Sequence, residues 1–303
     1  MNKVLVTTSS FGKDDPSIIT SLEEAGFEVV LNPYGRKLTE EEVLNLLLEV
    51  KPKAMIAGVE PLTAKVLDGI PSMSVISRCG IGLDSVDLDA AKKKGIRVLN
   101  TPDAPTEAVA ELTVGLMLSA MRRIVEVDSE IRAGNWKRPM GKLLGAQTVG
   151  LVGCGRIGSA VARLLKPFGV RLIGYDPFIK EHPAISILSL DELLKQADII
   201  SLHVPYNESM HHLVNKQLID KMKQGAIIIN TSRGGIVDEE ALYEALVSGH
   251  LGGACLDTFE REPYKGPLDE LSQVILTPHI GSYAKEARIK MEREAAHNLL
   301  STI

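Results

Sequence analysis

The 303-residue sequence predicts an α/β protein with two domains, each built on a doubly wound parallel sheet. Short apolar runs alternate with amphipathic helical stretches through the first hundred residues, and the same alternation begins again after a long helical segment. A glycine-rich turn stands where the second alternation begins, between a strand-like run and a helical run. The two alternations and the turn together indicate two successive sheets of parallel strands.

Five apolar runs predict the strands of the first sheet. They are KVLVTT (3–8), EVVLN (28–32), AMIAG (54–58), SVIS (74–77) and RVLN (97–100). Between the second and third runs lies LTEEEVLNLLLEV, which has helical spacing. Thr39 is a suitable N-cap for this helix because its hydroxyl can accept a backbone N–H.

The second alternation follows a long helical stretch, AELTVGLMLSAMRRIVEVDSEIRAG (110–134), which predicts one helix. Six apolar runs then predict the second sheet: TVGLVG (148–153), RLIGYD (171–176), DIISLHVP (198–205), GAIIINTS (225–232), GGACLDTF (252–259) and QVILTPH (273–279). The last helical segment, AKEARIKMEREAAHNLL, packs back on the first domain in this prediction. We therefore expect a first domain of residues 1–100, completed by 283–303, and a second domain of residues 101–282.

Composition excludes several classes of protein. The formal net charge is -5, and the basic residues are scattered, which argues against nucleic acid as a partner. No apolar run reaches the roughly 18 residues that a bilayer span needs, and the N-terminus has no signal-peptide pattern, so we expect a cytoplasmic protein without membrane contact. Cys79, Cys154 and Cys255 are far apart in the sequence and predict neither a disulfide framework nor a metal site.

The glycine-rich turn has the context of a dinucleotide site. Gly153-x-Gly155-x-x-Gly158 follows a predicted strand and opens a predicted helix, and the next strand ends in Asp176. The first glycine permits the tight turn, the second lets the backbone approach a pyrophosphate, and the third allows close packing of helix on strand. Because an acidic side chain at position 176 repels a 2′-phosphate, NAD is favoured over NADP. Arg156 is either a pyrophosphate contact or a solvated residue at the start of the helix.

Three charged residues follow predicted strands downstream of this turn: Arg233 in NTSRGG, Glu262 in DTFEREP and His279 in TPHIGS. Hydride transfer by a nicotinamide needs a proton donor, a partner that orients it and a cation for an anionic substrate, and these residue types supply all three. Each also has a structural interpretation: Arg233 could pair with Asp238, Glu262 could be a solvated turn residue, and His279 could be a half-buried histidine. Their occurrence together favours catalysis.

The glycine motif, HVPYNESMHHLVN, NTSRGGIVDEEALYEAL, GGACLDTFEREP and TPHIGS together resemble the D-isomer-specific 2-hydroxyacid dehydrogenases. The segment SRCGIGLDSVDLDAAKKKGIRVLNTPDAPTEAVAELT is similar to the substrate-loop region of the same family, and the short D-3-phosphoglycerate dehydrogenases without a regulatory domain are the most similar group. The resemblance implies two Rossmann-like domains, a flavodoxin-like substrate domain and an NAD-binding domain. It also implies closure about residues near 100 and 280 before hydride transfer.

The resemblance also implies roles for single residues. His279 would exchange the proton of the substrate hydroxyl, Glu262 would stabilise the imidazolium, and Arg233 would hold the carbonyl oxygen and carboxylate. The substrate carboxylate would bind the backbone amides of Gly80, Ile81 and Gly82. The residues implied around NAD are Gly153, Gly155, Arg156, Ile157, Gly158, Asp176, Val204, Thr231, Asp257 and Gly281.

Two departures from the family pattern concern the substrate. Asp84-Ser85 replaces the usual Asp-Asn pair, and Ala57 stands where many phosphoglycerate dehydrogenases have an arginine for the phosphate. Arg78 is a substrate-binding candidate that could replace this cation, and Lys137 and Arg138 could reach a site across a dimer interface or could be a solvated pair. The expected reaction is oxidation of D-3-phosphoglycerate in serine biosynthesis, with reduction of glyoxylate or hydroxypyruvate as the alternative.

Other interpretations remain open at this point. An NAD-sensing protein like the C-terminal-binding corepressors shares the fold and the Arg, Glu and His, although the chain lacks their long extensions. Formate and phosphite dehydrogenases share the scaffold too. Met117 and Met121 predict a core or dimer face on the long helix, from which we expect a homodimer. His211 and His212 are expected to point apart and to bind no metal.

Overall fold

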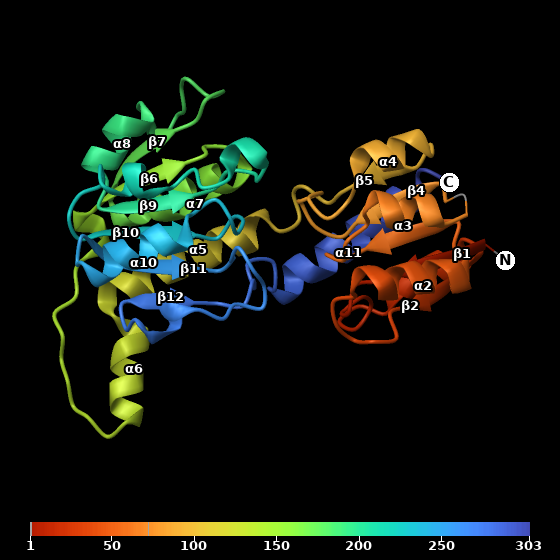
Figure 1. The fold of residues 1–303 in the computed structure, drawn as a ribbon, viewed down its shortest axis with the longest axis horizontal. Helices are drawn as coiled ribbons and strands as arrows, with labels where there is room; N and C mark the ends of the chain where they lie inside the picture. Colours follow the sequence, from red (N-terminus) through yellow and green to blue (C-terminus); the bar gives the residue numbers. More distant parts are fainter. Residues whose placement is uncertain (1, 72) are drawn as a thin grey trace. The chain divides into compact units, whose positions relative to one another are not determined.

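The computed structural model describes residues 2–71 and 73–303. The chain divides into two units, unit 1 of Met1–Pro105 with Ser282–Ile303 and unit 2 of Thr106–Gly281. The sequence predicts domain boundaries near residues 100 and 282. Figure 1 shows the elements of both units.

Unit 1 contains a five-stranded parallel sheet in the order β2-β1-β3-β4-β5. Its strands are β1 (Asn2–Val6), β2 (Phe27–Leu31), β3 (Ala54–Ala57), β4 (Val75–Arg78) and β5 (Arg97–Leu99). Its helices are α1 (Ser17–Glu24), α2 (Glu40–Val50), α3 (Ala64–Gly69), α4 (Leu88–Lys93) and α11 (Lys285–Leu300). All five strands that the sequence predicts are present, and each lies within about two residues of its expected bounds.

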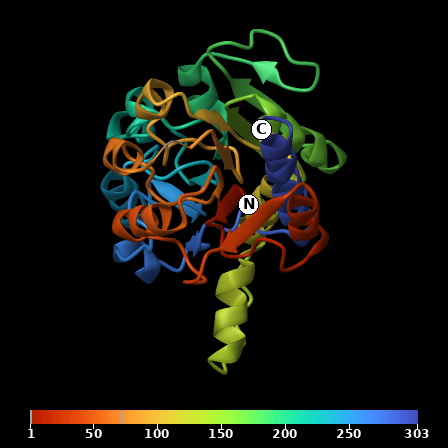
Figure 2. The same ribbon diagram turned by 90° about the vertical axis from the view of Figure 1, so that its right-hand side faces the viewer.

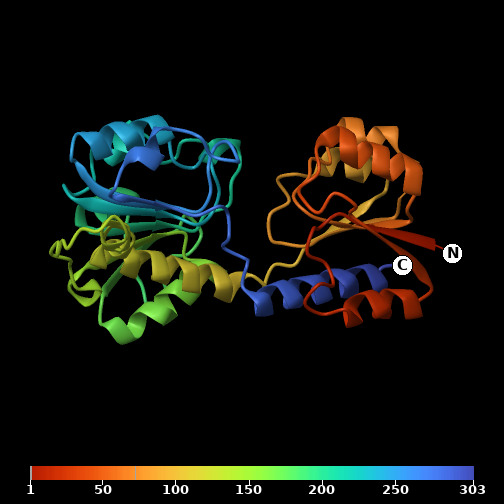
Figure 3. The ribbon, with the colours of Figure 1, turned by 90° about the horizontal axis from the view of Figure 1, so that it is seen from below.

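The two faces of this sheet carry separate cores, because successive side chains of a strand point to opposite faces. Leu5 packs with α2, α3 and α4, whereas Val4 and Val6 pack with α1 and α11. Figure 3 shows the two sets of helices on opposite faces of the unit 1 sheet. Thr39 forms the expected cap of α2 as part of a capping box: its hydroxyl accepts from Glu42 N, and its own N–H donates to the Glu42 carboxylate.

Unit 2 contains a seven-stranded parallel sheet in the order β12-β11-β10-β9-β6-β7-β8. Its strands are β6 (Thr148–Val152), β7 (Arg171–Tyr175), β8 (Ser186–Ile187), β9 (Ile199–Leu202), β10 (Ala226–Asn230), β11 (Leu251–Leu256) and β12 (Val274–Leu276). The sequence misses only β8, whose two residues are too short for a periodic signal. The chain runs outward from β6 to β8 and then returns to the other side of β6 at β9, so the strand order reverses between β6 and β9.

The helices of unit 2 cover both faces of its sheet (Figure 3). One face packs on α5 (Thr106–Arg122) and α7 (Arg156–Leu165), and the other on α8 (Leu190–Gln196), α9 (Lys216–Ile219) and α10 (Glu239–Val247). Four short 3-10 helices complete the unit: η1 (Leu144–Ala146), η2 (Lys166–Phe168), η3 (Glu208–Met210) and η4 (Pro267–Glu270).

The long helix predicted over residues 110–134 is wrong in one respect, because the structure breaks it in two. Arg123 adopts a left-handed φ of 52°, and α6 (Ile124–Arg132) leaves in a new direction. Met117 and Met121 of α5 are buried in the core of unit 2, so neither forms an open face. No residue of α6 is buried, and the helix projects from the unit in Figures 1 and 2.

Two negative findings apply to the residues that the structure describes. None of their helices combines the length and the apolar character needed to cross a bilayer. No three or more of their His, Cys, Asp and Glu side chains are grouped as metal ligands.

Candidate active site

The glycine-rich turn lies where the strand order of unit 2 reverses, at the carboxyl end of β6. Gly153 has a φ of 95°, and a Cβ there would lie 2.5 Å from the carbonyl oxygen of His203. A Cβ on Gly158 would overlap the carbonyl oxygen of Gly153. Gly155 is the N-cap of α7 without a side-chain cap, and a Cβ there would meet open space. The loop therefore leaves room at Gly155 and at the helix N-terminus, where a pyrophosphate binds in dinucleotide folds.

Asp176 follows β7 beside this turn and holds it in place. One carboxylate oxygen accepts from Cys154 N (3.0 Å), and the other accepts from Phe178 N (2.9 Å) and Ile179 N (3.2 Å). Burial raises the pKa of Asp176, but these backbone hydrogen bonds and Lys180 bring it below its usual value. The carboxylate is thus ionised at neutral pH, and an ionised carboxylate in this position can accept hydrogen bonds from the ribose hydroxyls of a dinucleotide.

Four further residues expected around NAD lie at the start of α7 or just beyond the ends of β9 and β10. Val204 lies next to Gly153, and Arg156 and Ile157 begin α7. Thr231 is 5% exposed, and its hydroxyl lies 2.8 Å from that of Thr113 on α5. The Thr231 side chain therefore points toward α5, and the Thr231 backbone lies at the carboxyl end of β10.

Arg233 belongs to a turn after β10 that the Asn230 side chain organises. Asn230 Oδ1 accepts from the backbone and hydroxyl of Ser232 (3.1 and 2.7 Å), and its Nδ2 donates to Arg233 O (2.9 Å). A Cβ on Gly234 would overlap the carbonyl of Phe259, so only glycine permits the approach of this turn to the loop that carries Glu262. Asn230 is 1% exposed and is not among the residues predicted from the sequence.

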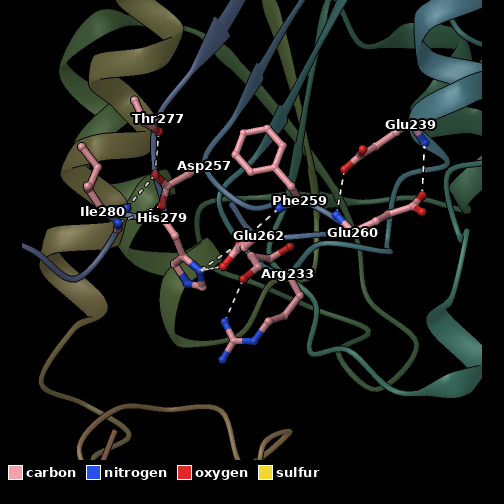
Figure 4. Close-up of polar contacts among 11 residues, drawn as sticks. Arg233, Glu239, Asp257, Phe259, Glu260, Glu262, Thr277, His279 and Ile280 are labelled. Atoms are coloured by element: carbon pink, nitrogen blue, oxygen red, sulfur yellow. Dashed lines mark hydrogen bonds and ion pairs between the residues drawn. The ribbon is translucent and has the colours of Figure 1, made fainter. Parts of the chain in front are cut away.

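His279 and Glu262 form a hydrogen-bonded pair. His279 Nδ1 lies 3.0 Å from both carboxylate oxygens of Glu262, and Phe259 N donates to Glu262 Oε1 (3.3 Å). The two side chains are 41% and 34% exposed, so they remain accessible to a ligand. Figure 4 shows Arg233 next to this pair. The three residues predicted from separate strand ends are thus brought together.

Asp257 stabilises the turn that carries His279. Its carboxylate is buried and accepts hydrogen bonds from the Thr277 hydroxyl (2.6 Å), Ile280 N (2.8 Å) and Gly281 N (2.8 Å) (Figure 4). Burial raises the pKa of Asp257, and these three hydrogen bonds oppose the effect. His279 has a left-handed φ of 54°, a conformation that a non-glycine residue keeps only when its surroundings enforce it. The hydrogen bonds of Asp257 provide that constraint.

A second group of polar side chains lies near the loop that carries Glu262. The Glu260 N–H donates to Glu239 (2.8 Å), and His212 Nε2 lies 2.9 Å from Glu260 Oε1. The expectation that His211 and His212 point apart is wrong, because their rings stack with centroids 3.9 Å apart. His212 has a left-handed φ of 50°, which turns its ring to the same side as that of His211.

The substrate loop predicted in unit 1 follows β4. The Gly80 amide donates to the Thr101 hydroxyl (2.8 Å), and the Gly80 carbonyl accepts from Thr101 N (3.0 Å). Asn100 Nδ2 donates to the Ile81 carbonyl (2.7 Å). Within the described chain, the amides of Ile81 and Gly82 donate to no protein acceptor. Two of the three predicted amides are therefore available to an anion.

Arg78 lies at the end of β4 opposite Ala57, the position that lacks the expected arginine. Arg78 is only 8% exposed, and its Nη1 donates to the Cys79 carbonyl. Cys79 is 2% exposed, and burial raises the pKa of its thiol to about 11. A guanidinium buried against its own backbone differs from the accessible cation that the sequence suggests.

Comparison with known proteins agrees with this geometry. The family profile described as "D-isomer specific 2-hydroxyacid dehydrogenase, NAD binding domain" matches residues 114–281. The chain belongs to the D-isomer specific 2-hydroxyacid dehydrogenases. It is therefore an oxidoreductase of 2-hydroxy acids, and it uses an NAD-type nucleotide.

Relatives in this family act on different acids. The chain is 41% identical over 296 residues to the hydroxypyruvate reductase of Thermotoga maritima, covering 93% of this chain and 96% of that protein. It is 42% identical over 299 residues to the D-3-phosphoglycerate dehydrogenase of Methanocaldococcus jannaschii, covering 95% of this chain and 55% of that protein. The crystal structure of the TT0316 protein from Thermus thermophilus superimposes with a TM-score of 0.91 at 42% identity, covering 99% and 96% of the two chains.

Proposed function

We propose that this dehydrogenase reduces a small unphosphorylated 2-oxo acid, hydroxypyruvate or glyoxylate, to the D-2-hydroxy acid with NADH. The observation that carries the proposal is the His279–Glu262 pair. Because Nδ1 of His279 is directed at Glu262, its Nε2 is the nitrogen left to give a proton to a substrate oxygen. Bound NADH supplies the hydride that reaches C2 of the acid.

The polar residues have distinct roles in this reaction. His279 gives its Nε2 proton to the carbonyl oxygen as that oxygen becomes a hydroxyl, and Glu262 stabilises the imidazolium beforehand. Arg233 polarises the carbonyl and binds the carboxylate, since a guanidinium can hold both oxygens at once. The amides of Ile81 and Gly82 in unit 1 are donors of the kind that bind a carboxylate.

The substrate class is inferred from positions 57 and 78 of unit 1, neither of which offers an accessible cation to a phosphate. Ala57 supplies none, and Arg78 is buried. Oxidation of D-3-phosphoglycerate, the first expectation from the sequence, remains the second candidate. Lys137 favours it, because it follows the projecting helix α6 with its side chain 64% exposed, although it pairs there with Glu130 (2.9 Å).

We also propose that the protein is a homodimer that acts in the cytoplasm. The arm after α6 exposes large apolar side chains: Trp136 is 81% exposed, Met140 91% and Leu143 73%. A cavity of about 350 Å³ lies beside this arm, at the amino ends of the unit 2 strands and away from the catalytic residues. Exposed apolar groups at this density are typical of a surface that a partner covers. The three cysteines are free, which suits a reducing compartment.

The decisive experiment is NADH oxidation by the purified protein with hydroxypyruvate, glyoxylate, 3-phosphohydroxypyruvate, pyruvate and 2-oxoglutarate, with NADPH as the cofactor control. We expect the highest kcat/KM for hydroxypyruvate or glyoxylate with NADH. His279→Ala should lower kcat by at least about a hundredfold, the contribution of one general acid, while NADH affinity is retained. A preference for 3-phosphohydroxypyruvate would select the second candidate, and unchanged kcat in the variant would refute the role of His279.

A further inference from the structure

The glycine-rich turn of unit 2 is restrained on both sides of its middle residue, Cys154. The Cys154 N–H donates to Asp176 (3.0 Å), and the Cys154 carbonyl accepts from the Ser159 hydroxyl (3.0 Å). Ser159 belongs to α7, and its hydroxyl lies 3.1 Å from Nε2 of His182, which belongs to the segment between β7 and β8. The catalytic steps proposed above use neither Ser159 nor His182.

The hydrogen bonds around His182 run in one direction. Nδ1 of His182 accepts from Ala184 N (3.2 Å), so Nδ1 carries no proton, and the proton of the neutral imidazole is on Nε2. Nε2 therefore donates to the Ser159 hydroxyl, which in turn donates to the Cys154 carbonyl. This order is determined because a backbone N–H at one end can only donate and a backbone carbonyl at the other can only accept. His182 thus connects the segment between β7 and β8 to the glycine-rich turn through one hydroxyl.

The restrained carbonyl sets the direction of the next amide. The Cys154–Gly155 peptide is planar and trans, so the Gly155 N–H points opposite to the Cys154 carbonyl. The carbonyl points into α7, toward Ser159, and the Gly155 N–H therefore points out of the N-terminus of the helix, as the free N–H groups of a first helical turn do. Within the described chain, Gly155 N donates to no protein acceptor. This amide is available to an anion that binds at the N-terminus of α7.

We propose that His182 is a positioning residue for the nucleotide: it orients the Ser159 hydroxyl, which restrains the Cys154 carbonyl and so directs the Gly155 amide toward the pyrophosphate. A hydroxyl proton rotates to suit its surroundings, and a donor at the hydroxyl oxygen leaves that proton directed at the carbonyl. The inference rests on the proposed function in one respect, since it takes NADH as the hydride donor.

The test separates the shape of residue 182 from its hydrogen bonds. His182→Phe keeps a ring and removes both nitrogens, whereas His182→Gln loses the ring and keeps a nitrogen that can donate to Ser159. Fluorescence titration with NADH, without a substrate, gives the Kd in the absence of turnover. The Kd should rise about three- to tenfold in His182→Phe, the range of one hydrogen bond, and stay within about twofold of the wild type in His182→Gln. A role in packing alone predicts the reverse order.

Further variants test the path through Ser159. Ser159→Ala should raise the NADH Kd by a similar factor, and adding His182→Phe to it should cause no further loss, because His182 acts through Ser159. ADP-ribose, which carries the pyrophosphate but no nicotinamide, should lose affinity by the same factor as NADH in each variant. The matched control is His250→Phe: His250 Nε2 lies 2.9 Å from the Ile219 carbonyl, but His250 precedes β11 at the amino edge of the sheet, so the NADH Kd should not change.

Urea unfolding shows whether each variant is folded. Wild-type NADH affinity in His182→Phe overturns the inference, and so does an equal loss in His182→Gln. A loss in the double variant equal to the product of the two single losses also overturns it, because His182 would then act apart from Ser159. Unchanged affinity for ADP-ribose excludes an effect on the pyrophosphate and has the same consequence. If His182→Phe does not fold, wild-type NADH affinity in Ser159→Ala overturns the inference.

The same titrations distinguish this inference from the proposed function. If the wild type binds no NADH, both fail. If the affinities change as expected but no 2-oxo acid is reduced, only the proposed function fails. If 2-oxo acids are reduced but the variants bind NADH like the wild type, only the role of His182 fails.

Discussion

His203, a single side chain beneath the glycine-rich turn, makes the stability of unit 2 sensitive to acid. Burial lowers the pKa of His203 from 6.5 to about 4. Its Nε2 lies 2.9 Å from the Ser201 hydroxyl, and its Nδ1 is buried without a hydrogen-bond partner among the described residues. The folded protein therefore keeps this imidazole neutral where an unfolded chain would protonate it.

The sign of the effect follows from the two protonation states. Above pH 6.5 the imidazole is neutral in the folded and in the unfolded chain, so His203 does not affect the free energy of unfolding there. As the pH falls from 6.5 toward 4, only the unfolded chain binds the proton, and the free energy of unfolding decreases. The full loss is about 3 kcal/mol. His203→Gln keeps a polar group near Ser201 but cannot titrate, so urea unfolding from pH 7 to 4 should show a flatter profile for the variant. Parallel profiles would contradict the buried neutral imidazole.

Residue types at strand ends were enough to predict the catalytic candidates. Arg233, Glu262 and His279 follow predicted strands, and parallel strands end at one edge, which brings such residues together. The sequence does not predict that Asn230 and Asp257 stabilise the turns of Arg233 and His279. This role depends on hydrogen bonds between side chain and backbone that form only in the folded turns. Nor does the sequence reveal that Arg78 is buried.

Apolar runs predict parallel strands well because such strands are buried on both faces. The break between α5 and α6 was not predictable from periodicity. Arg123 has ordinary helical propensity, and its left-handed conformation depends on the local fold, which includes a hydrogen-bonded ion pair with Glu126 (2.7 Å). Charge and helical spacing continue across the break, so the sequence indicates one helix where the structure has two.

The glycine-rich turn is an element whose glycines serve different purposes, and this separates stability from cofactor binding. Gly158→Ala pushes a Cβ into the Gly153 carbonyl and should cost about 1–3 kcal/mol of unfolding free energy. Gly155→Ala meets open space at a φ of -71°, so it should change stability by less than about 0.5 kcal/mol. Its Cβ nevertheless obstructs the approach of a pyrophosphate, and NADH affinity should fall by at least about tenfold.

Urea unfolding and fluorescence titration with NADH measure the two effects in the same preparations. Wild-type NADH affinity in Gly155→Ala would show that the cofactor does not approach this residue. Wild-type stability in Gly158→Ala would show that α7 can move away from β6 without cost.

Two chains are expected to associate through the arm after α6. Sedimentation equilibrium at micromolar concentration should give twice the 32.8 kDa of one chain. Met140→Asp with Leu143→Asp places charges on two of the most exposed apolar side chains of the arm and should give the monomer. Phe178→Asp is the matched control, because Phe178 is also 91% exposed but follows Asp176, and this variant should still sediment as a dimer. A monomeric wild type would refute the dimer.

The divided chain of unit 1 also has a consequence for synthesis on the ribosome. The sheet face that carries Val4 and Val6 is completed by Met291, Ala295 and Leu299 of α11. Between Pro105 and Ser282 the ribosome makes all of unit 2, which takes roughly ten to thirty-five seconds at about 5–20 residues per second. During that interval the nascent first unit has an uncovered apolar face, so the half of the protein that emerges first is the half that finishes folding last.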